Sequence, residues 1–224
     1  MASQPIYQFY AELLDYKPKI WRRFQVLNNI TMAKLGYVLM SMFEMQASHL
    51  FCFDVPDGFN QQSDHYELLS GDIFEDRDGR DIHDPAKKKI KDAVSKKDSQ
   101  IVFSYDFGDS WAVRLILENI IEDIEMPGKE LPRVLDGAGY GIVEDCGGVD
   151  GLKELAKAFK KKSGSQYREL SEWLGRTELD MAAFDIADAN LRVKKIPRIY
   201  ADIYENDTPP SQKSVDFLER KYLK

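Results

Sequence analysis

The stretch that most constrains the fold is Ile101–Ile121, with the sequence IVFSYDFGDSWAVRLILENII. Large apolar residues alternate with smaller or polar ones on both sides of Gly108, which is typical of two strands joined by a tight turn. The central run Tyr105–Trp111 (YDFGDSW) places two carboxylates and a tryptophan at the turn. We therefore predict a β-hairpin with a polar tip.

Two registers of this hairpin are open. A three-residue loop pairs Phe107 with Trp111 and gathers the large apolar side chains on one face. A two-residue loop pairs Phe103 with Arg114 and mixes charge into that face, although glycine at the first loop position is typical of the shorter turn. We expect the three-residue loop, because burial of a whole apolar face outweighs a turn preference. Phe107 and Trp111 would then lie in the core and Asp106 would face outward.

The composition indicates a globular chain. The 224 residues suffice for one large domain or two small ones without disulfides, and 43% of them are apolar and 31% charged. The formal net charge of -7 argues against non-specific nucleic-acid binding, which depends on a basic surface.

The chain opens without the basic and apolar segments of a signal peptide, and its two cysteines, Cys52 and Cys146, are far apart. Both features predict a cytoplasmic protein with reduced thiols. No apolar run approaches the roughly 20 residues of a membrane helix, so we expect no membrane partner.

The remaining pattern predicts an α+β fold, an antiparallel sheet with hairpins packed against several helices. We expect a single domain over residues 1–195, followed over residues 196–224 by a linker and a short amphipathic helix. The expected strands span residues 6–16, 20–27, 49–55 and 66–69. The expected helices span residues 31–45, 84–95, 150–159, 167–174, 186–193 and 214–223. Residues 125–149 are expected to be irregular and residues 197–210 to be a linker.

Two ligand-loop interpretations fail on spacing. The acidic run Glu75–Asp81 is not an EF-hand loop, because Phe74 and Pro85 would occupy its first and twelfth ligand positions. The glycines of Gly137–Gly141 do not complete either nucleotide-binding fingerprint. The cofactor is therefore left unassigned.

Several separated motifs resemble those of the plasmid pRiA4b ORF-3-like family. They read PKIWRR (18–23), SHL (48–50), YDFGDSW (105–111), EDCGG (144–148) and FDI (184–186). The resemblance covers residues 6–190 and implies an α+β fold in a bacterial or archaeal cytosolic protein of unestablished function, often associated with mobile elements. There are two departures from the family pattern: Val113 stands where a histidine is usual, and Ile142-Val143 where two prolines are usual. The missing histidine weakens an enzymatic interpretation.

These motifs supply the candidate polar site. Its members are His49, Asp106, Asp109, Glu144, Asp145, Cys146 and Asp185. Four carboxylates, those of Asp106, Asp109, Glu144 and Asp145, would suit a hard cation or a metal-assisted hydrolase, with His49 as a further ligand or base. In the structural alternative, Asp109 stabilises its own turn, Asp106 pairs with an arginine, and the Glu-Asp pair fixes its loop.

Cys146 and His49 could instead form a nucleophile and base, since a reactive thiolate needs a nearby base or positive charge. The alternative is that Cys146 is a small packed residue in a tight loop.

A binding module for an unknown protein or small molecule is the function that we favour, with a metal-assisted hydrolase as the first alternative and a nucleic-acid-associated accessory protein as the second. Candidate binding residues are Trp21, Arg22, Arg23 and Arg114, because aromatic and guanidinium groups suit planar or anionic partners. In the structural alternative the tryptophans anchor the core and the arginines pair with the acidic motifs.

Overall fold

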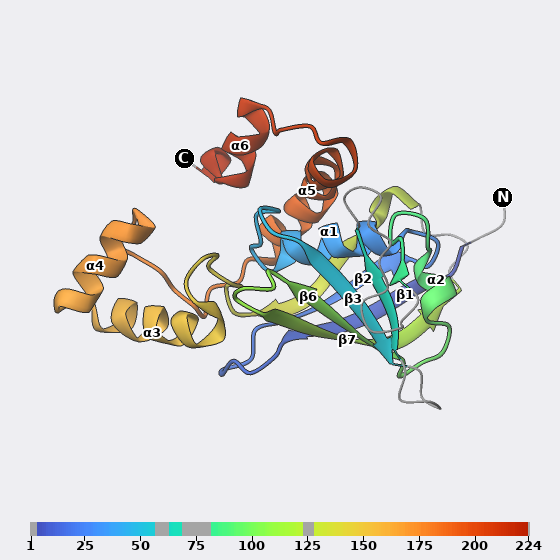
Figure 1. Ribbon diagram of the computed structural model, residues 1–224, viewed down its shortest axis with the longest axis horizontal. Helices are drawn as coiled ribbons and strands as arrows, with labels where there is room; N and C mark the ends of the chain where they lie inside the picture. The colour runs from blue at the N-terminus through green and yellow to red at the C-terminus, as the bar shows by residue number, and fades with distance from the viewer. Residues whose placement is uncertain (1–3, 57–62, 69–81, 123–127, 224) are drawn as a thin grey trace.

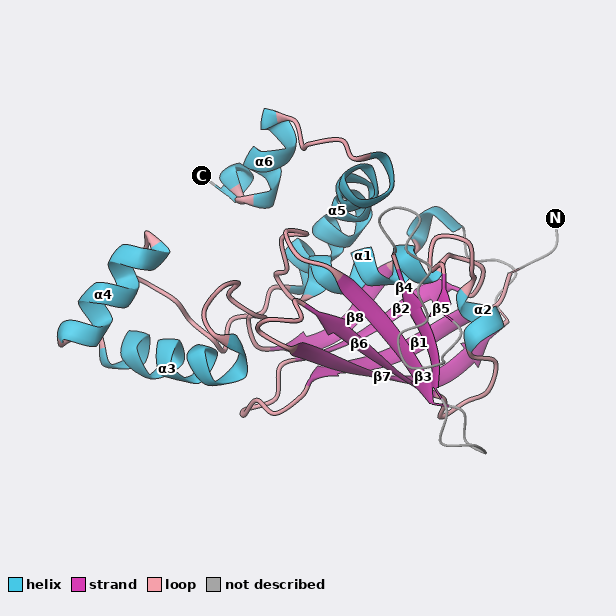
Figure 2. Ribbon diagram, viewed as in Figure 1, coloured by secondary structure: helices cyan, strands magenta, loops and turns pink. Residues whose placement is uncertain are grey.

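The computed structural model describes residues 4–56, 63–68, 82–122 and 128–223. One mixed sheet dominates the fold, with strand order β5-β4-β3-β6-β7-β1-β2-β8 (Figures 1 and 2). All neighbouring strands are antiparallel except β4 and β5. The strands are β1 (Ile6–Leu13), β2 (Trp21–Leu27), β3 (Phe51–Pro56), β4 (Ser63–Glu67), β5 (Ile82–His83), β6 (Gln100–Tyr105), β7 (Trp111–Ile121) and β8 (Arg133–Ala138).

The helices lie on one face of the sheet and at its ends. They are α1 (Met32–Met42), α2 (Ile90–Ala93), α3 (Gly148–Lys161), α4 (Ser165–Leu174), α5 (Ile186–Asn206) and α6 (Gln212–Leu218), with short 3₁₀ turns at Gly128–Glu130 and Lys221–Leu223. Helix α1 lies across the sheet and α5 packs on α1, whereas α3 and α4 pair with each other beside the body (Figure 1). The predicted α+β class is confirmed.

Helix α1 fixes which face of the sheet becomes the core. The side chain of Thr31 accepts a hydrogen bond from the Lys34 N–H, as expected of an N-cap. A Cβ atom at Gly36 would lie 2.9 Å from the Phe51 ring, so the helix approaches β3 as closely as glycine allows. The opposite face of the sheet, which we call the polar face, carries the alternate residues of each strand.

The central hairpin forms with the predicted faces but not with the predicted register. Tyr105 pairs with Trp111 and Phe103 with Val113, so the connection spans residues 106–110. Trp111 is fully buried, as predicted. The prediction for Phe107 is wrong, because its side chain is 48% exposed, and Asp106 does not face outward, because it is only 8% exposed.

Three other elements differ from the sequence predictions. The expected helix from residue 84 is limited to α2, because the Asp84 side chain instead closes a turn through the Ala86 N–H. Residues 125–149, expected to be irregular, contain β8 at the edge of the sheet. Residues 197–206, expected to belong to a linker, are helical and continue α5 through Pro197. The acidic run at 75–81 lies outside the described residues.

The edge of the sheet at β8 is held by a side chain of α5. The Asn190 amide oxygen accepts a hydrogen bond from Val134 N–H at 2.9 Å, and its nitrogen donates to the Val134 carbonyl at 2.9 Å. Both outward-facing peptide groups of Val134 are therefore satisfied. Across the parts of the chain that the structure describes, no helix is both long and apolar enough to cross a membrane.

Candidate functional site

Three segments that are far apart in the sequence meet at one end of the sheet. They are residues 44–50 after α1, the hairpin tip 106–110, and residues 144–148 before α3; we call this place the loop junction. Hydrogen bonds join the segments directly: the Asp106 N–H donates to the Leu50 carbonyl at 3.0 Å, and the Gly147 N–H donates to the Asp109 side chain, at Oδ2, at 3.2 Å. Three of the motifs quoted above therefore lie together.

Glu144 fastens the junction. Its Oε1 accepts from the Gln46 N–H and from the Tyr105 hydroxyl, each at 2.5 Å, and its Oε2 accepts from the Ser48 hydroxyl. The residue is 8% exposed. Burial and the adjacent Glu144 carboxylate raise the pKa of Tyr105 far above its usual range, so its hydroxyl remains a donor. Both carboxylate oxygens of Glu144 are thus engaged in holding the loops together.

His49 lies at the centre of the junction and faces two other carboxylates. Its Nε2 is 3.2 Å from Asp145 Oδ1 and 3.5 Å from Asp106 Oδ2. Although Nε2 is buried, neither contact has the geometry of a hydrogen bond. One donor atom from each of the three residues lies within 4.8 Å of the others, which is close enough for a single cation to contact all three.

The surroundings hold the imidazole and the two carboxylates in place. The Tyr204 hydroxyl donates to the His49 carbonyl, and the Tyr105 ring meets the imidazole edge-on at 5.7 Å. Asp106 Oδ1 accepts hydrogen bonds from two N–H groups of its own turn, which leaves Oδ2 directed at His49. Asp145 is different, since its side chain is 70% exposed and forms the solvent side of the cluster.

Close backbone approach explains the glycine at 148, whereas at 147 only the φ of +88° favours glycine. A Cβ atom at Gly148 would lie 2.4 Å from the Asp109 carbonyl oxygen, and its φ of +67° is in the left-handed region. Only glycine allows the loop to reach the hairpin tip this closely. The side chain of Asp109 helps to dock the loop, and it is not one of the three donors that meet at His49.

Cys146 does not have the surroundings of an activated nucleophile. Burial, with a smaller effect from Asp109, raises the pKa of its thiol to about 12. Its Sγ contacts the Gly148 carbonyl at 3.6 Å. A thiol with a raised pKa is a poor nucleophile at neutral pH, which favours the packed alternative for Cys146.

Arg22 lies inside the core, where it also contributes to the lining of a cavity. It is 1% exposed, and each of its five N–H groups is placed on a main-chain carbonyl. The acceptors are Trp21, Met42, Ala138, Gly139 and Tyr140, at 2.8–3.0 Å. Burial lowers the pKa of Arg22 to about 10, so the group is still charged at neutral pH. This arginine anchors the segment that precedes the loop junction.

The other candidate binding residues lie on the polar face, because successive residues of a strand point to opposite faces. Arg23 forms a two-point ion pair with Glu118 and lies 5.5 Å from the Trp21 ring centroid. Arg114 pairs with Glu12. The structure thus separates the four residues between two faces. Arg114 on β7 has its acidic partner on the adjacent strand β1, and Arg23 on β2 reaches across β1 to Glu118 on β7.

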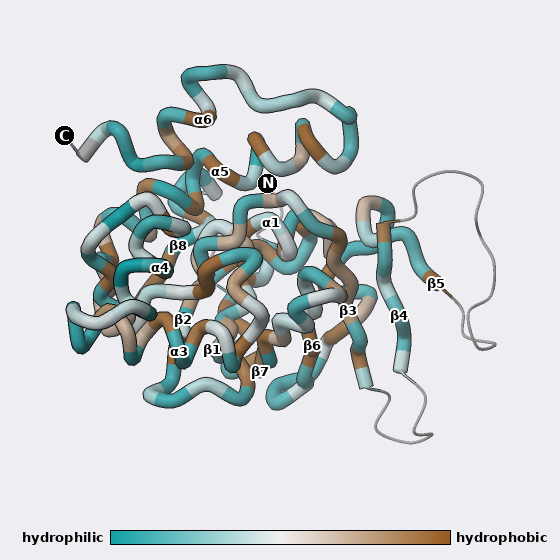
Figure 3. The backbone as a smooth tube through the Cα atoms, turned by 60° about the vertical axis from the view of Figure 1, so that its left-hand side comes forward, coloured by the Kyte–Doolittle hydropathy of each residue, from teal (hydrophilic) through white to brown (hydrophobic). Residues whose placement is uncertain are grey.

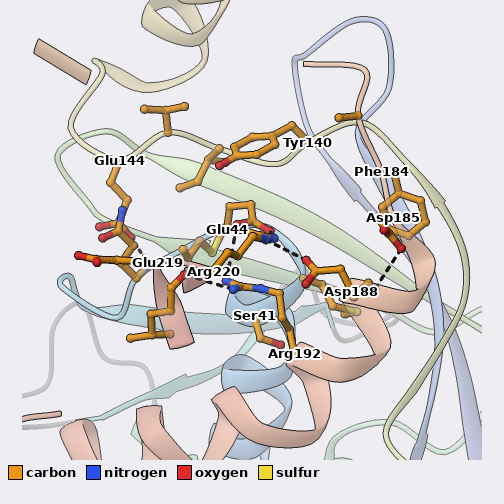
Figure 4. Close-up of a pocket in the computed structure, with 18 of the residues that line it drawn as sticks. Ser41, Glu44, Tyr140, Glu144, Phe184, Asp185, Asp188, Arg192, Glu219 and Arg220 are labelled. Atoms are coloured by element: carbon orange, nitrogen blue, oxygen red, sulfur yellow. Dashed lines mark hydrogen bonds and ion pairs between the residues drawn. The ribbon is translucent and has the colours of Figure 1, made fainter. Parts of the chain in front are cut away.

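Asp185 does not join the cluster at His49, because it lines a cavity of about 600 Å³ that does not include His49, Asp106 or Asp145 (Figure 4). It caps α5 by accepting from the Ala187 and Asp188 N–H groups. Glu44, Asp188 and Arg220 form a connected ion-pair group in the same cavity, and Glu144 lines its other side. Sequence reasoning did not single out Arg220, whose only signal was its place in the last amphipathic helix.

The fold and the junction define a class of α+β protein in which loops at one end of an antiparallel sheet gather a histidine and two carboxylates. The chain belongs to the plasmid pRiA4b ORF-3-like protein family, whose model matches residues 5–189. It is 28% identical over 190 residues to the uncharacterized protein y4hQ of Sinorhizobium fredii (strain NBRC 101917 / NGR234), covering 84% of this chain and 91% of that protein.

A solved structure supports the same fold. The crystal structure of the protein of unknown function MM3350 from Methanosarcina mazei Go1 is similar with a TM-score of 0.70 and 28% identity, covering 83% of this chain and 96% of that one. The two departures from the family pattern lie away from the three donors. Val113 is fully buried in the core, and Ile142 donates its N–H to the Phe43 carbonyl at 2.9 Å, a bond that proline could not make.

Proposed function

We propose that the protein is a cation-binding module, with a divalent ion held at the loop junction by His49, Asp106 and Asp145. The observation that carries the proposal is the buried Nε2 of His49, which lies between two carboxylates without a hydrogen bond. One imidazole and two carboxylates suit borderline or hard divalent ions such as Mn²⁺. The protein's location in the cytoplasm and its association with mobile elements are further parts of the proposal; the two cysteines, neither of them in a disulfide, support the former.

The alternative state of the same residues is an ion pair. A protonated His49 would balance the two carboxylates without any metal. The two states differ in their response to added cations, because a bound ion stabilises only the folded protein.

The test is thermal unfolding with and without Mn²⁺. At 100 times the dissociation constant, binding stabilises the fold by about 2.7 kcal/mol, which raises the Tm by about 5–10 °C. The variants Asp106→Asn and Asp145→Asn should lose this shift. Asparagine tolerates the positive φ angles of +55° and +58° at these positions, so both variants should fold.

Asp109→Asn is the matched control. It removes a carboxylate from the same junction without touching the three donors, and its oxygen can still accept from Gly147. It should keep the shift in Tm. A wild-type protein that shows no binding of Mn²⁺ or another divalent ion by calorimetry, or a shift that survives in both Asn variants, would exclude the proposal.

A metal-assisted hydrolase is the second candidate, favoured by the exposure of Asp145. Three protein ligands beside solvent resemble a catalytic metal site, which keeps a position for water. Hydrolysis of bis(p-nitrophenyl) phosphate or p-nitrophenyl acetate that requires Mn²⁺, and that falls at least tenfold in His49→Gln, would support it. Absence of turnover by the Mn²⁺-loaded protein on either substrate would leave binding as the function.

A further inference from the structure

A second group of metal-type side chains lies on the polar face of β3 and β4. Cys52 and Asp54 alternate along β3, and His65 and Glu67 alternate along β4. The strands pair Cys52 with Glu67 and Asp54 with His65, so all four side chains leave the same face as direct or diagonal neighbours. We call these four residues the thiolate cluster.

Distances within the cluster match those between ligands of one ion. One donor atom from each of Cys52, Asp54 and His65 lies within 4.8 Å of the others. His65 Nδ1 is 2.9 Å from Asp54 Oδ1. Two ligands of a tetrahedral Zn²⁺ at about 2.0–2.1 Å are roughly 3.3 Å apart, so a small adjustment suffices to admit an ion.

Glu67 completes a pattern found around metal-bound histidines. His65 Nε2 lies 3.2 Å from Glu67 Oε2, on the side of the ring away from Asp54. A ligating imidazole commonly donates its other N–H to a carboxylate, which fixes the ring and its tautomer. Nδ1 is thereby left as the lone-pair donor on the side of Asp54.

The location suits a site that solvent can reach. Cys52 is buried, whereas Asp54, His65 and Glu67 are partly exposed. Strand β4 lies at one margin of the body and is mostly hydrophilic, beside the more hydrophobic β3 (Figure 3). The sulfur would be shielded, and the ligands Asp54 and His65 would be accessible, so that the ion can enter from the β4 side.

From this geometry we infer a thiolate-containing transition-metal site, with Cys52, Asp54 and His65 as ligands and Glu67 as the residue that orients His65. Sulfur, imidazole and carboxylate ligands together select Zn²⁺ or a similar ion over Mg²⁺ and Ca²⁺. The Cys52 thiol gives its proton to solvent when the metal–sulfur bond forms. The site shares no ligand with the loop junction and does not depend on the function proposed there.

The competing arrangement is an imidazolium between two carboxylates. The hydrogen bond to Asp54, with a further contribution from Glu67, raises the pKa of His65. In that arrangement Cys52 has no part in binding, and this difference defines the test.

Cobalt absorption spectroscopy reports directly on the sulfur. Co²⁺ added to the full-length protein should give the intense near-ultraviolet charge-transfer band of a Co²⁺–thiolate bond, and Zn²⁺ should displace it. The chain has two cysteines, so Cys146→Ser is the matched control and should keep the band. Cys52→Ser should abolish it, with folding checked by circular dichroism.

Two further variants keep the test decisive if Cys52→Ser does not fold. His65→Gln should abolish the band or weaken Co²⁺ binding more than a hundredfold, and Glu67→Gln should weaken it about 10–100-fold. His49→Gln should leave it unchanged. The inference is overturned by a wild-type protein without the band, by a band that persists in Cys52→Ser, or by affinity for Co²⁺ that His65→Gln does not alter.

Discussion

The two halves of the segment 138–148 use polar groups in opposite ways. In the first half, the carbonyls of residues 138–140 close around Arg22 and satisfy its guanidinium inside the core. In the second half, Asp145 stands at the surface and faces a histidine nitrogen that has no hydrogen bond. The first site is complete without a partner, whereas the second has capacity left for one. Stability should therefore depend on the first and cation response on the second.

The largest effect should come from Arg22. Arg22→Met removes a charge that is fully enclosed and leaves five carbonyls without their donor, which we expect to cost about 3–5 kcal/mol of the free energy of unfolding. Arg22→Lys keeps the charge but offers only three donors and should still lose about 2 kcal/mol. Urea unfolding measures both. If Arg22→Lys were as stable as wild type, the five carbonyl contacts of the Arg22 guanidinium would not contribute to stability as described.

Glu144 should show a smaller effect of the same kind. Glu144→Gln presents an NH₂ group to donors that the carboxylate now accepts from, so we expect a loss of about 1–3 kcal/mol. Glu154→Gln, on the exposed face of α3, is the control and should change stability by less than about 0.5 kcal/mol. Equal effects of Glu144→Gln and Glu154→Gln in urea unfolding would show that the Glu144 carboxylate does not stabilise the fold through these hydrogen bonds.

Acid should lower the free energy of unfolding through Glu12, whose carboxylate is paired on the polar face of the sheet. Despite the opposing effect of burial, hydrogen bonds from Lys19, Arg114 and Tyr10 lower the pKa of Glu12. Because the pKa of Glu12 is lower in the folded protein than in the unfolded chain, the ionised carboxylate stabilises the fold at pH values above its ordinary pKa of 4.5. This stabilisation is lost as the pH falls through the folded pKa. Glu12→Gln should therefore be less stable than wild type at pH 7, with a smaller loss on acidification. A Tm that falls equally in both proteins would contradict this.

The smallest effect on stability is expected at Asp145. In metal-free buffer, Asp145→Asn should lie within about 0.5 kcal/mol of wild type, because the side chain is exposed and asparagine accepts the left-handed conformation. Asp145→Ala should cost about 1 kcal/mol through its φ of +58° alone. A larger loss in Asp145→Asn would show that Asp145, like Glu144, has a structural role.

Alternation along the strands predicts the faces of the hairpin but cannot fix its register. Pairing Tyr105 with Trp111 in place of Phe107 shifts the register by two residues, and a shift of two leaves every side chain on its face. The outcome is instead set at the tip, where the Asp106 side chain holds a five-residue turn. Alternation also places Arg22 and Arg23 on opposite faces of the sheet, and this placement could be predicted from the sequence once β2 was recognised as a strand.

The motifs in the sequence identify the residues that meet at the loop junction, but they do not identify the role of each residue, and Asp185 from the same predicted set lies elsewhere. Glu144 and Asp145 are adjacent and chemically alike, yet one is enclosed by Tyr105 and Ser48 and the other faces solvent. Only tertiary contacts decide which is which. Helix α5 was cut short in the prediction because Pro197 usually ends a helix, whereas here Ile196 and Tyr200 are buried and hold the helix across the missing hydrogen bond.

The contact between Asn190 and Val134 affects whether two copies of the chain can pair through the β8 edge of the sheet. An amide side chain offers the same donor and acceptor as the peptide group of an adjacent strand, so Asn190 occupies the position that a foreign strand would need. Strand β8 is the last of the sheet, and its free side would otherwise be a template for chain-to-chain pairing. One asparagine on α5 thus blocks strand pairing between copies of the chain at this position, a role separate from either of the proposed metal sites.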